Sequence, residues 1–191
     1  GADVIVLDGM QGGTAATQEV FIEHVGIPLL CAIRPAVQAL QDMGMHRKVQ
    51  LIVSGGIRTG ADVAKALAMG ADAVAVGTAA LVALGDNDPK WEKEYHDLGT
   101  KPGAYDDWHE GKDPAGITTQ TPELIKRLDP VTAGRRLANY LKVMTLEAQT
   151  LARACGKNHL HNLEPEDLVA LTIEAAAMAR VPLAGTNWIP G

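Results

Sequence analysis

The chain has 191 residues, 47% of them hydrophobic and 21% charged, with a formal net charge of −6 at pH 7. This composition is typical of a globular protein with a sizeable core in one or two domains. The acidic balance argues against nucleic acid or a membrane surface as the main partner. Because no run of about 18 apolar residues occurs, the sequence predicts no transmembrane helix.

Two features indicate the compartment. The first residues are typical of a strand rather than of a signal peptide. Cys31 and Cys155 lie far apart and in no metal-binding spacing, which favours a reducing environment. We therefore expect a cytoplasmic protein.

Short apolar runs and helical segments alternate along the first 85 residues. Residues 1–8 and 70–77 share one pattern, Gly-Ala-Asp followed by an apolar run, and residues 49–54 form a third such run. Runs of this kind are typical of parallel strands covered on both faces, and their alternation with helices predicts right-handed βαβ units. We expect the intervening helices at 18–25, 31–43 (with Pro35 in the first turn) and 61–68.

Two of the apolar runs lead directly into glycine. Gly55 and Gly56 follow Ser54, and Gly77 precedes Thr78. Glycine has no Cβ, so a phosphate can approach the backbone N–H groups closely, and the N-terminus of a following helix favours an anion. Paired phosphate loops after strands 7 and 8 recur in (β/α)8 barrels.

The fold class that this pattern predicts is α/β, with residues 1–85 as the C-terminal strands and helices of a (β/α)8 barrel. A doubly wound sheet is the alternative, although it usually carries one phosphate loop rather than two in succession. Three or four strands cannot close an eight-stranded barrel of about 250 residues. We therefore expect the chain to be the C-terminal part of a longer polypeptide, or to be completed by a partner.

The sequence changes character after Gly85. Asp, Gly, Pro and Lys are frequent and no periodicity is sustained, so we expect an irregular loop over residues 86–120. Residues 121–191 are expected to form a helical region that packs on the barrel. Its predicted helices are 121–128, 131–154 and 164–180.

Four segments, in order along the chain, resemble the FMN-binding synthase domain of glutamate synthases. They are Leu-Asp-Gly-Met-Gln-Gly-Gly-Thr-Ala-Ala-Thr at 7–17, Gly-Gly-Ile-Arg-Thr-Gly-Ala-Asp-Val-Ala at 55–64, Val-Gly-Thr-Ala-Ala-Leu at 76–81 and Pro-Ala-Gly-Ile-Thr-Thr-Gln at 114–120. In that family, FMN lies at the mouth of a (β/α)8 barrel. Ammonia from a glutaminase domain condenses there with 2-oxoglutarate, and the 2-imino acid is reduced to glutamate.

The resemblance implies which residues bind the cofactor and the substrate. The loops after strands 7 and 8 would hold the FMN phosphate, and the loop after the first strand would face flavin and substrate. The cofactor-binding set is Ser54, Gly55, Gly56, Gly77, Thr78, Gly12 and Gly13, and the substrate-binding set is Thr14, Gln11 and Arg34.

The iron–sulfur segment departs from the family pattern. The family places three cysteines before its Pro-x-Gly segment, whereas the two nearest positions match Trp108 and Asp113 here, and the first falls near Pro102. Such clusters require thiolates, so we expect no iron–sulfur cluster in this chain. His109 and Asp113 are spaced for a metal site, but a solvated pair is the favoured interpretation, and no metal site is predicted.

The substrate loop also differs. The family has His-Asp where this chain has Met10 and Gln11. The family has an acidic residue where this chain has Arg34. An arginine near the barrel mouth can bind a carboxylate bidentately, and a surface arginine is the alternative. Asp8 either hydrogen-bonds flavin or substrate, or caps its loop.

Without a cluster, the electron path usual in the family is missing. The pattern resembles the flavin subunit of N-methylglutamate synthase, which exchanges the amino group of glutamate for methylamine. That resemblance implies an amidotransferase-like subunit and a Gly-x-Gly-x-Gly β-helix subunit as partners. The alternatives are glutamate synthase activity with electrons delivered directly to FMN, a non-catalytic assembly module, and another phosphate-binding barrel of the inosinate dehydrogenase kind, whose catalytic cysteine loop is not seen here.

Overall fold

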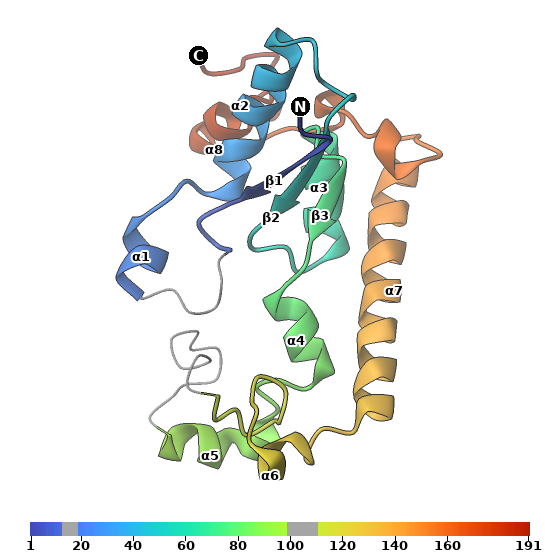
Figure 1. Ribbon diagram of the computed structural model, residues 1–191. Coiled ribbons are helices and arrows are strands. Elements are labelled where there is room, and N and C mark those ends of the chain that lie inside the picture. The colour runs from blue at the N-terminus through green and yellow to red at the C-terminus, as the bar shows by residue number, and fades with distance from the viewer. Residues whose placement is uncertain (13–18, 99–110) are drawn as a thin grey trace. The chain divides into compact units, whose positions relative to one another are not determined.

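The computed structural model describes residues 1–12, 19–98 and 111–191 (Figure 1). The chain divides into two compact units, one of residues 1–12, 26–76 and 143–191, and the other of residues 13–25 and 77–142. The elements in chain order are β1 Val4–Asp8, α1 Glu19–His24, α2 Leu29–Asp42, β2 Gln50–Ser54, α3 Gly60–Ala68, β3 Ala73–Ala75, α4 Thr78–Leu84, the 3₁₀ helix η1 Pro89–Trp91, α5 Glu92–Asp97, α6 Pro122–Ile125, α7 Pro130–Ala154, the 3₁₀ helices η3 Leu160–Asn162 and η4 Pro165–Asp167, and α8 Ile173–Ala179.

The first unit contains a parallel sheet of three strands in the order β1-β2-β3. Asp8 lies opposite Ser54, and Ser54 lies opposite Ala75, so the carboxyl ends of the strands meet at one edge. This confirms the parallel strands that the apolar runs predict. The described fold is an α/β arrangement consistent with part of a barrel domain, and its three strands do not form a closed barrel.

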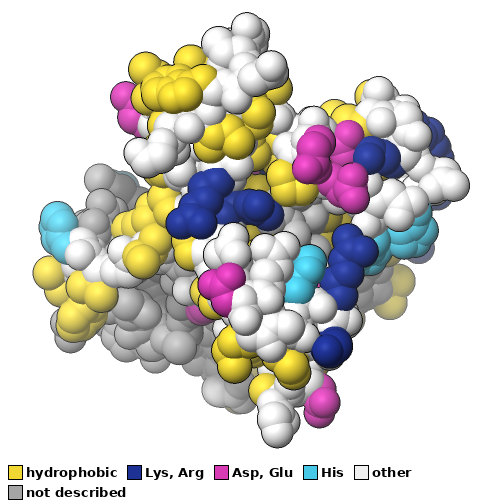
Figure 2. Space-filling view, turned by 90° about the horizontal axis from the view of Figure 1, so that it is seen from above, with side chains coloured by type: hydrophobic (Ala, Val, Ile, Leu, Met, Phe, Trp, Pro, Cys, Tyr) yellow, Lys and Arg dark blue, Asp and Glu magenta, His cyan; other side chains and the backbone are white. Residues whose placement is uncertain are grey.

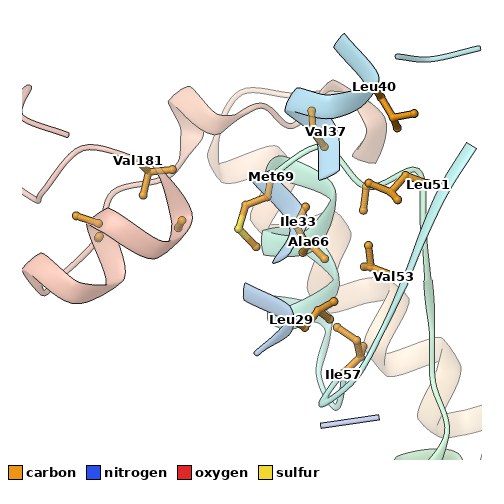
Figure 3. Packing of buried hydrophobic residues seen from close by; sticks show 14 of the residues in the cluster. Leu29, Ile33, Val37, Leu40, Leu51, Val53, Ile57, Ala66, Met69 and Val181 are labelled. Carbon is orange, nitrogen blue, oxygen red and sulfur yellow. The ribbon is translucent and has the colours of Figure 1, made fainter. Parts of the chain in front are cut away.

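The core of this unit lies on one face of β2. Leu51 and Val53 alternate along the strand and are almost fully buried, and Figure 3 shows both on the side of the strand that faces Ile33 and Ala66. Burial of a side chain of this size stabilises a fold by about 1.5–3 kcal/mol. Helix α8 and Val181 complete the same cluster.

The other face of the sheet carries apolar side chains of β1 that the described residues leave exposed. Val6 of β1 and Ile52 of β2 are paired in register, so their side chains share this face. Val6 is 60% exposed and Val4, on the same face, is 48% exposed. Parallel strands are ordinarily covered on both faces, so exposed apolar side chains on this face are consistent with part of a barrel domain.

Helices α3 and α7 cross at very close range through small side chains. Ala64 and Ala68 of α3 pack against Ala148 and Ala152 of α7. At the start of α3, a Cβ on Gly60 would overlap the Met144 carbonyl oxygen and would lie 2.6 Å from the Ala148 nitrogen. The crossing therefore depends on the missing side chain.

Replacing Gly60 with alanine should destabilise the protein by about 1–3 kcal/mol, because the added methyl group forces the two helices apart. Gly134 is the matched control: it lies in α7 with open space where its Cβ would be. Gly134→Ala should stabilise the protein by about 0.5–1 kcal/mol, since glycine disfavours helix. Denaturation midpoints of the full-length protein measure both changes, and equal effects would contradict the close crossing.

Three predicted elements differ from the structure. Pro35 lies in the interior of α2 rather than in its first turn, because the helix begins at Leu29. The predicted irregular loop contains α5 within its described part. The expected helix over 164–180 is only η4 and α8, because Ala170 between them is extended and exchanges backbone hydrogen bonds with Pro182 and Ala184.

Within the described residues, no helix combines the length and the apolar character that crossing a membrane requires.

Candidate anion-binding site

Three backbone segments meet at the carboxyl ends of β1 and β2. The Gly9 N–H donates to the Ser54 carbonyl at 2.9 Å, and the Gly12 N–H donates to the Gly9 carbonyl at 2.8 Å. A Cβ on Gly9 would lie 2.7 Å from the Cβ of Leu29, the first residue of α2. A Cβ on Gly55 would lie 3.3 Å from the Gly12 nitrogen. The loops after β1 and β2 therefore touch backbone to backbone.

The glycine pair after β2 has two unused donors. Gly55 and Gly56 have φ values of +121° and +72°, a region that L side chains rarely adopt. Among the described residues, neither glycine N–H donates a hydrogen bond. Adjacent N–H groups with no Cβ beside them suit the oxygens of a phosphate or carboxylate.

The N-terminus of α3, by contrast, is already occupied by acidic side chains. Asp62 Oδ2 accepts hydrogen bonds from the N–H groups of Arg58 and Thr59 at 3.0 and 2.9 Å. Glu147 Oε2, on α7, accepts from the Gly60 N–H at 2.8 Å. Among the described residues, the Ala61 N–H is therefore the one donor at the start of α3 without a hydrogen bond, and the glycine loop adds two more.

Gln11 and Asp8 lie beside the glycine pair. Gln11 Oε1 accepts a hydrogen bond from the Leu29 N–H at 3.0 Å and so caps α2. Its Cβ would lie 3.4 Å from a Cβ on Gly56. The Asp8 carboxylate lies against Gly12 and leaves no room for a side chain there.

Arg34 lies elsewhere in the first unit. Its Nη1 donates to the Met69 carbonyl at 3.1 Å. Met69 caps the C-terminal end of α3, which precedes the amino end of β3. The guanidinium therefore caps α3, and the predicted substrate role for Arg34 gains no support from this geometry.

The remaining predicted residues fall in the second unit or outside the described residues. Gly77 is the N-cap of α4, no side chain caps that helix, and space is open where a Gly77 Cβ would be. Thr78 begins α4. Gly13 and Thr14 lie outside the described residues.

The segment after residue 111 is organised by one carboxylate. Asp113 Oδ1 accepts from the Tyr95 hydroxyl at 2.7 Å and from the Ala115 N–H at 2.9 Å. Its Oδ2 accepts from the N–H groups of Ile117 and Thr118 at 2.7 and 3.0 Å. Both oxygens are therefore committed to the protein.

The iron–sulfur cluster that the family implies does not fit these residues. Asp113 stands where the family has one of its cysteines, and both of its oxygens accept hydrogen bonds from the protein. Trp108 and His109 lie outside the described residues. The two cysteines of the chain are Cys31, in α2, and Cys155, after α7. In the described part of the chain, no three His, Cys, Asp or Glu side chains are grouped to hold a metal ion.

The surface at the amino ends of the strands carries mixed charge. Figure 2, which looks down on this end of the view in Figure 1, shows basic, acidic and histidine side chains interspersed with apolar ones. In the first unit, Lys157 Nζ lies 3.7 Å from Glu164 Oε2 and 3.3 Å from Asp167 Oδ2. A uniformly basic surface of the kind that binds nucleic acid is not seen on this face.

Sequence reasoning missed three residues that shape these sites. The pattern Thr59-Gly-Ala-Asp62 is a capping box, so the role of Asp62 was readable from the sequence. The roles of Glu147 and Tyr95 could not be predicted in this way, because their partners, Gly60 and Asp113, are distant in the sequence.

Comparison with known proteins agrees with the resemblance. The model of the conserved region in glutamate synthase matches residues 1–89 and 104–158. A glutamate synthase large subunit-like protein of Rhizobium meliloti is 85% identical over 191 residues, which are 100% of this chain and 43% of that protein. The archaeal glutamate synthase [NADPH] of Methanocaldococcus jannaschii is 44% identical over 162 residues, 85% of this chain and 29% of that protein.

The fold fragment and the matched region define an α/β protein of the glutamate synthase class. The chain belongs to the glutamate synthase family. It spans 43% of the length of the Rhizobium relative and 29% of the archaeal one.

Proposed function

We propose that this chain provides an FMN phosphate site in a glutamate synthase-type flavoenzyme. The observation that carries the proposal is the pair of unused N–H groups at Gly55 and Gly56, in a loop that follows a parallel strand. From the family resemblance, Gly77 and Thr78 are proposed as the second phosphate loop. Ser54 is proposed to assist the loop of Gly55 and Gly56, and Gly12 and Gly13 are proposed as contacts of the flavin. When bound, FMN supplies hydride transfer at the α-carbon of an amino acid.

In this proposal, the residues of the chain bind and orient FMN and the substrate and do not themselves react. The loop N–H groups would neutralise the phosphate, and the Asp62 and Glu147 carboxylates keep the α3 N-terminus closed to it. The Gln11 amide oxygen is held by the Leu29 N–H, which leaves its amide nitrogen as a donor beside the loop. Thr14 and Gln11 are proposed substrate contacts.

For the reaction we propose amine exchange of the N-methylglutamate synthase type. The specific support is the segment at Asp113, whose oxygens accept hydrogen bonds from Tyr95 and from the loop backbone, and which lacks cysteines for a cluster. Glutamate and methylamine giving N-methylglutamate and ammonia changes no oxidation state overall, so the exchange needs no electron donor. An amidotransferase-like subunit and a Gly-x-Gly-x-Gly β-helix subunit are the proposed partners.

Flavin binding is tested at Gly77, where an added Cβ meets no atom of the described residues within 4 Å. Gly77→Leu in the full-length protein should weaken FMN binding about 10- to 100-fold, since each hydrogen bond to a charged group contributes about 1.5–3 kcal/mol. The Tm of the flavin-free protein should stay unchanged. Gly134→Leu is the control, because an added Cβ at Gly134 also meets open space, and this variant should keep its flavin. Arg58→Ala should keep most of its flavin. Unaltered flavin content in Gly77→Leu would rule out the phosphate assignment.

The reaction is tested in the full-length protein with its partner subunits, without oxygen and without added reductant. We expect ¹⁵N-labelled glutamate and methylamine to give N-methylglutamate and labelled ammonia in equal amounts, measured by mass spectrometry. Strict dependence on NAD(P)H or ferredoxin, with glutamate formed from 2-oxoglutarate, would instead identify a glutamate synthase with direct electron delivery. A full-length protein that binds no flavin would identify an assembly module.

A further inference from the structure

Two acidic side chains in the second unit are buried around one phenol. Asp86 and Asp113 are 3% and 8% exposed, and Tyr95 is 7% exposed. The Tyr95 oxygen lies 2.7 Å from Asp113 Oδ1 and 3.2 Å from Asp86 Oδ1. One hydroxyl therefore bridges two carboxyl groups.

The proton count of this contact is fixed by chemistry. A tyrosine hydroxyl donates one hydrogen bond, and the shorter distance assigns it to Asp113. The Asn87 N–H donates to both oxygens of the second contact, to Asp86 Oδ1 at 3.0 Å and to the Tyr95 oxygen at 3.3 Å, and a proton on Asp86 adds a direct hydrogen bond between them. With Asp86 ionised, two oxygens bearing lone pairs would face each other in a buried setting.

The surroundings of the two carboxyl groups are unequal. Asp113 accepts three backbone N–H groups in addition to the phenol, from Ala115, Ile117 and Thr118. Asp86 accepts one, from Asn87 at 3.0 Å, and its Oδ2 is buried without a hydrogen-bond partner in the described part of the chain. Hydrogen bonds to the charged form favour ionisation, whereas burial without them favours the neutral acid.

Two arginines of this unit pair with other acidic side chains. Arg136 donates to the Leu84 carbonyl and lies 3.8 Å from Asp88, which also pairs with Lys90 at 3.5 Å. Arg127 pairs with Glu94 at 2.6 Å.

We propose that this buried pair holds one proton, that the proton resides on Asp86, and that the ionised Asp113 is the fixed hub of the 113–118 loop. Burial, followed by the charge of Asp113, raises the pKa of Asp86, in agreement with this assignment. Burial also raises the pKa of Tyr95 well above its usual value, so the phenol keeps its proton.

The assignment predicts opposite outcomes for two matched substitutions. Asp86→Asn replaces a neutral acid by a neutral amide, and only the wild-type chain gains a solvated carboxylate when it unfolds at pH 7, so the Tm of the full-length variant should equal or exceed that of wild type. Asp113→Asn places an NH₂ group against N–H donors, so the Tm should fall by about 5 °C or more, or the protein should fail to fold. Equal losses in the two variants would overturn the proposal.

Infrared spectroscopy locates the proton without relying on stability. At pH 7 the wild-type protein should show the carbonyl stretch of a buried neutral carboxylic acid, and Asp86→Asn should lack it. Persistence of that band in Asp86→Asn, or its absence from wild type, would contradict the assignment.

The pH dependence of stability is a second test. Because the folded-state pKa of Asp86 is raised, the favourable contribution of Asp86 to the free energy of unfolding is complete below the ordinary carboxyl pKa and declines as pH rises. The stability of Asp86→Asn relative to wild type should therefore grow with pH.

Discussion

The backbone contact between the loops after β1 and β2 determines where the candidate site residues of the first unit lie. Gly9 donates to the Ser54 carbonyl while its Cα faces Leu29 of α2. Two strands and a helix thus converge on a residue without a side chain. Any larger residue at Gly9 would separate them, and the Gly55 loop would lose its support from the Gly9 and Gly12 backbone.

The start of α3 differs from the helix start that usually follows a phosphate-binding loop. In many such loops the helix N-terminus contributes both donors and dipole to the anion. Here Asp62 and Glu147 already neutralise the start of α3, so the helix secures the packing of α7 instead. The proposed anion contact therefore rests on the glycine N–H groups, which lie in a loop of positive φ angles.

The sequence predicts features set by neighbouring residues better than features set by contacts between residues far apart in the chain. The parallel strands follow from uninterrupted apolar runs, and the glycine loops follow from the residues that end those runs. Ala170 breaks a predicted helix because its partners, Pro182 and Ala184, lie on a later segment that no periodicity reveals. The Glu147 contact with Gly60 spans 87 residues, and only the fold brings the two together. The role of Arg34 depends in the same way on where α3 ends.

The loop around Asp113 illustrates what changes when a carboxylate holds a segment together. Four hydrogen bonds from the protein itself fix it, and all four donors are present as soon as the chain is synthesised. A loop built in this way closes without delivery of iron or sulfide, and nothing in those four bonds is destroyed by oxygen. The hydrogen bonds that hold residues 113–118 therefore depend on the chain alone.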